Sequence, residues 1–79
     1  MANHSEILEE GEKVRRLQVA VDLALNIIRQ TDMPVEEASQ LAASARRMAI
    51  TLFPDKGETY DLIYAPRFQR LFKEKYKMI

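Results

Sequence analysis

Cysteine is absent from the chain, and histidine occurs only once, as His4. Without cysteine the chain has no disulfide and no thiolate metal site. A nucleophilic serine needs a neighbouring base, and His4, close to the N-terminus, has no partner at a catalytic or metal-ligand spacing. The lack of disulfides and of an export signal favours a cytoplasmic protein.

Other signatures of catalysis are missing as well. The acidic pairs Glu9-Glu10 and Glu36-Glu37 are adjacent in sequence, so on a helix the two carboxylates of a pair point to different faces. Lys56-Gly57 has the reverse order of a phosphate-binding loop, which also needs an earlier glycine. We therefore expect a non-enzymatic protein with no catalytic residue, no cofactor and no metal.

Glycine and proline are scarce, with two and three residues, whereas good helix formers are common. No segment alternates apolar and polar residues as a half-buried strand does. A chain of 79 residues is the size of one domain. The composition therefore predicts an all-α fold over residues 1–79, a small bundle of three principal helices.

Net charge is also absent, since twelve basic residues balance twelve acidic ones. The two signs are instead separated along the chain. Residues 1–12 carry four glutamates and no Lys or Arg, whereas residues 65–79 carry five basic residues and one glutamate. Ends of opposite sign can attract each other within or between chains, or both can be solvated.

A long uninterrupted hydrophobic run is missing too. The most apolar segment, residues 17–28, is interrupted by Gln18, Asp22 and Asn26. It is shorter and more polar than the roughly 20 apolar residues that cross a bilayer, and it lies too far from the N-terminus for a signal peptide. We expect no membrane partner.

On a helical wheel the apolar residues of this segment cover more than half of the circumference. Leu17, Val21, Leu25 and Ile28 share one face with smaller residues, and the apolar surface continues beyond that face. A helix of this kind must be covered on more than one side. Either the other two helices cover it, or a second chain does. The residues predicted for such a self-interface are Val19, Leu23 and Ile27.

Start and stop signals divide the chain into helices at about residues 5–30, 34–53 and 58–77, after a disordered segment 1–4. Gly11 predicts either a break or one frayed helix starting near Ser5. Pro34 suits the first turn of the second helix, whose apolar face is centred on alanines. Only a few residues connect the first and second helices, so we expect these two helices to pack antiparallel. Pro66 predicts a kink or a split in the third helix.

All six aromatic residues lie between residues 53 and 76. Tyrosine and arginine often carry interface energy, so this region predicts a surface for a partner protein. Phe68, Leu71 and Phe72 have an alternative interpretation as core. The residues predicted for the partner surface are Tyr60, Tyr64, Arg67 and Arg70.

A second hypothesis concerns DNA or RNA. The segment Glu37–Met48 faintly resembles a helix-turn-helix register, although glycine is usual where Ala42 stands. One continuous helix is the better interpretation. Arg46, Arg47 and Lys73 are the candidate phosphate contacts. The sequence thus favours a protein-interaction or adaptor module that forms a homodimer or binds another protein, with a small nucleic-acid-binding regulator as the alternative.

Overall fold

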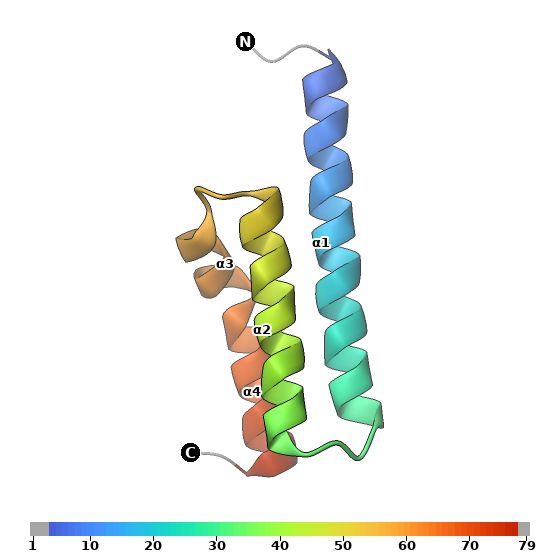
Figure 1. The fold of residues 1–79 in the computed structure, drawn as a ribbon, viewed down its shortest axis with the longest axis vertical. Coiled ribbons are helices and arrows are strands. Elements are labelled where there is room, and N and C mark those ends of the chain that lie inside the picture. The colour runs from blue at the N-terminus through green and yellow to red at the C-terminus, as the bar shows by residue number, and fades with distance from the viewer. Residues whose placement is uncertain (1–3, 78–79) are drawn as a thin grey trace.

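A computed structural model describes residues 4–77, with side chains described from residue 10 onward, and these residues form four helices and no strand (Figure 1). The predicted all-α bundle is confirmed. The segment 1–4 predicted to be disordered lies outside the described residues up to residue 3, and the first helix already begins at His4. The helices are α1 (His4–Gln30), α2 (Val35–Leu52), α3 (Gly57–Ile63) and α4 (Ala65–Tyr76).

Helix α1 runs from His4 through Gly11 without interruption, so of the two predicted alternatives the structure has the single helix and not the break. A Cβ atom at Gly11 would meet no atom within 4 Å. The helical preference of the flanking residues therefore outweighs the cost of one glycine, which is about 1 kcal/mol relative to alanine. The N-terminal part of α1 projects beyond the other helices (Figure 1), and Leu17 is the first residue with a described side chain that is buried.

Helices α1 and α2 pack antiparallel, as the short connection predicts (Figure 1). Helix α2 starts after Pro34, whose carbonyl accepts the first helical hydrogen bond from the Ala38 N–H at 3.1 Å. Small side chains on α2 face the bulky ones of α1, which lets the two helix axes approach closely. The core residues of this pair are Leu17, Val21, Ala24, Leu25, Ile28, Ala38, Ala45 and Ala49.

The third predicted helix is split into α3 and α4 with Tyr64 between them, as Pro66 predicts. Pro66 has no N–H to donate, and its ring would clash with the carbonyl of Leu62 if one helix continued. The Tyr64 N–H closes α3 by donating to the Tyr60 carbonyl at 2.8 Å, and the Arg67 N–H then donates to the Tyr64 carbonyl at 3.0 Å. The split changes the direction of the chain.

Helix α4 packs against both α1 and α2 and is fixed at its end to the connection between them. The Lys75 ammonium donates to the carbonyls of Ile28 and Thr31. The Tyr76 hydroxyl donates to the Met33 carbonyl at 2.9 Å. The last carbonyls of a helix lack partners within it and carry partial negative charge, so a cation placed there stabilises the end of α1.

Candidate interaction surfaces

The three long helices leave a groove between each pair. Helix α1 presents Asp22 and Arg29 to its groove with α4, and Leu23 and Ile27 to its groove with α2. These two sets are rotated by about 130° from each other around α1. The groove between α1 and α2 therefore faces away from α4.

We call this groove, together with Val19 one helical turn before Leu23 on α1, the open face. It has a volume of about 310 Å³ and an almost wholly apolar lining. Leu23 is 57% exposed and Val19 is 59% exposed, whereas Val21 on the opposite side of α1 is fully buried. The lining residues are Ala20, Leu23, Ala24, Ile27, Leu41, Ser44, Ala45 and Met48.

The predicted self-interface residues Val19, Leu23 and Ile27 thus lie together on one surface. Helix α4 packs against α1 and α2, and α3 packs against α2, but within residues 4–77 no other helix lines the open face. Monomeric proteins rarely expose large contiguous apolar patches, and such patches often mark binding sites. Whether a second copy binds here stays a prediction.

Charged residues stand at the two ends of the open face. Arg16 lies one helical turn before Ala20 on α1, and Glu37 lies one turn before Leu41 on α2. Because α1 and α2 are antiparallel, these two residues lie at opposite ends. Both are exposed. Among the described side chains, neither takes part in an ion pair.

The second predicted surface needs a correction at Tyr60. This side chain is only 4% exposed and belongs to the core, where it lies beside Ala42 and Arg46 of α2. Its hydroxyl is buried without a hydrogen-bond partner. Burial, and next the charge of Asp61, raise the pKa of Tyr60. Tyr60 therefore cannot contribute to an exposed partner surface.

The other three residues of that prediction remain accessible. Tyr64 is half-buried, and the Arg67 guanidinium lies 5.5 Å from the centre of its ring. Arg67 also lies 3.9 Å from an Asp22 carboxylate oxygen. Arg67 and Arg70 line the polar groove between α1 and α4, which has a volume of about 490 Å³. Arginines and carboxylates together make the lining of this groove polar. Binding of a partner protein in the groove stays a prediction.

Two of the three predicted nucleic-acid contacts already have hydrogen-bond partners within the chain. Arg46 donates from Nε and Nη2 to the two carboxylate oxygens of Asp61 at 2.9 and 3.0 Å. This pairing lowers the pKa of Asp61 and raises the pKa of Arg46. Arg47 donates to the Ser44 hydroxyl at 2.9 Å, and Lys73 is exposed on a different helix, α4.

The segment Glu37–Met48 lies inside one uninterrupted helix, α2. The turn of a helix-turn-helix motif is therefore absent at Ala42, and the interpretation of this segment as one continuous helix is confirmed. Binding of DNA or RNA through Arg46, Arg47 and Lys73 stays a prediction.

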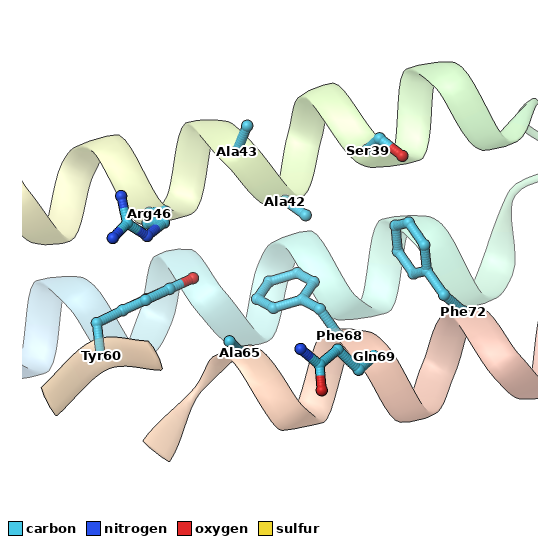
Figure 2. A pocket seen from close by; sticks show the side chains of 9 residues that line it. All are labelled: Ser39, Ala42, Ala43, Arg46, Tyr60, Ala65, Phe68, Gln69 and Phe72. Carbon is cyan, nitrogen blue, oxygen red and sulfur yellow. The ribbon is translucent and has the colours of Figure 1, made fainter. Parts of the chain in front are cut away.

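A third groove lies between α2 and α4, with α3 at one end (Figure 2). The rings of Phe68 and Phe72 point from α4 toward Ala42 of α2, and Arg46 and Tyr60 stand at the α3 end. The groove is apolar, with a volume of about 280 Å³. The small alanine side chains of α2 leave this space above the aromatic rings.

Two exposed apolar side chains of α3 were missed by reasoning from the sequence. Leu62 is 79% exposed and Ile63 is 52% exposed. On a helical wheel Leu62 lies about 160° from both Tyr60 and Tyr64, and Tyr60 and Leu62 keep this relation within α3. This position opposite the tyrosines is the signal that could have indicated the exposure of Leu62.

Comparison with known proteins finds no family model that matches the chain, and no similar curated protein or solved structure. In the described part of the chain, no three potential metal ligands among His, Asp and Glu come together. No helix in that part has the length and apolar character needed to cross a membrane.

Proposed function

We propose that this protein is a non-enzymatic interaction module that self-associates through the open face of α1 and α2. The observation that supports the proposal best is the exposure of Leu23 and Val19 beside an apolar groove. Burying apolar surface contributes roughly 25 cal/mol per Å², and fully burying a leucine side chain contributes about 1.5–3 kcal/mol. A second copy that presents the same face buries Leu23, Ile27 and Met48 on both sides.

The residues around the groove suit contact between helices. Ala20, Ala24 and Ser44 have small side chains, so a helix of a second copy can approach the groove closely. The Ser44 hydroxyl donates to the Gln40 carbonyl at 3.0 Å and accepts from Arg47, so its burial leaves no unsatisfied group. The open face can therefore be buried against a second copy without leaving the Ser44 hydroxyl unpaired.

Substitution of Leu23 by glutamate tests this proposal. A carboxylate buried in an apolar contact without a partner costs several kcal/mol, so we expect the dissociation constant of the dimer to rise roughly 100-fold or more. The measurement is analytical ultracentrifugation over a range of concentrations. Circular dichroism checks that the monomer stays helical.

Leu62→Glu is the matched control, because Leu62 is also an exposed leucine on a helix but lies on α3, away from the open face. It should leave the association constant unchanged. If Leu23→Glu associates as tightly as the unmodified chain, or if Leu62→Glu weakens association equally, the open face is not the interface.

A further inference from the structure

The positions of Arg16 and Glu37 relative to the open face indicate how two copies would be oriented. Leu23 and Ser44 lie at the middle of the groove, which extends from Ala20 and Met48 to Ile27 and Leu41. Arg16 precedes Leu23 by seven residues on α1, and Glu37 precedes Ser44 by seven residues on α2. Each charge is therefore two helical turns, or about 10 Å, from the middle, in opposite directions.

We infer that two copies pair antiparallel about a two-fold axis at Leu23 and Ser44, with Arg16 of each copy against Glu37 of the other. This inference rests on the proposed function and adds the arrangement of the dimer. A two-fold axis perpendicular to the helices places the Arg16 end of one open face over the Glu37 end of its partner. In such a self-complementary contact, each pair forms twice.

The alternative arrangement has its two-fold axis parallel to the helices. It would place Arg16 against Arg16 and Glu37 against Glu37, and like charges in an interface oppose association. The charge pattern thus selects one orientation, while the apolar groove supplies most of the contact. Because neither charge has an ion-pair partner among the described side chains of its own chain, both remain accessible to a second copy.

Charge reversal tests the orientation. In the antiparallel dimer, Arg16→Glu places a second carboxylate against that of Glu37 at both ends, and Glu37→Arg places two guanidinium groups together at both ends. Each variant alone should raise the dissociation constant roughly tenfold. The chain that carries both changes should return close to the original constant, because both ion pairs are restored with reversed direction. Sedimentation measures the constants.

Mixing the two single variants gives a second readout, which shows whether these charges lie in the interface, whereas the single variants alone distinguish the two orientations. Arg16→Glu and Glu37→Arg chains together form a heterodimer in which each reversed charge meets an opposite charge. Native mass spectrometry separates the three dimers by mass. We expect the heterodimer to exceed the one half of all dimers that random mixing gives, and the excess should shrink at about 1 M salt, where surface charges are screened.

The matched control is the pair Arg15→Glu and Glu36→Arg. These residues have the same charges and the same positions along the chain to within one residue, but Arg15 is rotated by about 100° from Arg16 and Glu36 by about 100° from Glu37. Arg15 lies beside Val19 in a shallow hollow outside the groove between α1 and α2. Glu12 also lies within one turn of both Arg15 and Arg16, so any effect on helix α1 itself is shared. The control pair should mix at random.

Three results would overturn the inference. If Arg16→Glu and Glu37→Arg each leave the dissociation constant unchanged while the two variants still prefer each other in the mixture, like charges meet in the unmodified dimer and the copies are parallel. If the two variants mix at random although Leu23→Glu abolishes the dimer, the open face is the interface but the orientation is wrong, and the proposed function stands. If the unmodified chain stays monomeric at millimolar concentration, the orientation and the proposed function are both wrong.

Discussion

At the scale of single residues, two tyrosine hydroxyls have opposite surroundings. The Tyr60 hydroxyl is buried without a hydrogen-bond partner, whereas the Tyr76 hydroxyl donates to the Met33 carbonyl at 2.9 Å. A buried polar group without a partner costs free energy, and an ordinary hydrogen bond contributes about 1 kcal/mol. Removing the two hydroxyls should therefore have different effects on stability.

We expect Tyr60→Phe to leave the free energy of unfolding unchanged or to raise it by up to about 1 kcal/mol. Tyr76→Phe is the matched control and should lower it by about 1 kcal/mol, because the Met33 carbonyl loses its donor. Urea unfolding followed by circular dichroism measures both. A loss of more than about 1 kcal/mol in Tyr60→Phe would mean that the Tyr60 hydroxyl has a hydrogen-bond partner.

At the scale of the helices, α1 contains a residue that weakens it. Gly11 lies in the exposed N-terminal part of α1, and a Cβ atom there meets nothing within 4 Å. Gly11→Ala should stabilise this part of the helix by up to about 1 kcal/mol. We expect a larger helical signal in circular dichroism and slower amide hydrogen exchange before Leu17. Unchanged exchange in this segment would show that Gly11 does not limit its helicity.

The helices themselves follow from local chemistry, which explains how far the sequence predicts them. Pro66 lacks an N–H whatever the rest of the chain does, so the split between α3 and α4 can be predicted. The short connection before Pro34 leaves α1 and α2 only an antiparallel packing. The exact position of the break, at Tyr64, depends on packing, and so does the side of α3 that faces the core, which is the side of Tyr60 and not that of Leu62.

At the scale of the whole molecule, the open face depends on contacts between distant segments. The wheel of residues 17–28 predicts that α1 needs cover on more than one side, and it places Val19, Leu23 and Ile27 outside the main face. It does not predict on which side α4 packs. That side is fixed by contacts far apart in sequence, such as those of Lys75 with Ile28 and Thr31. The surface that stays open therefore becomes known only from the structure.

Self-association through the open face is the central claim, and the mass of the unmodified chain in solution tests it most directly. Light scattering after size exclusion, at several concentrations, gives this mass. We expect a value that rises with concentration from that of the 9.2 kDa chain toward twice that mass. A mass that stays at one chain at every concentration would contradict the claim.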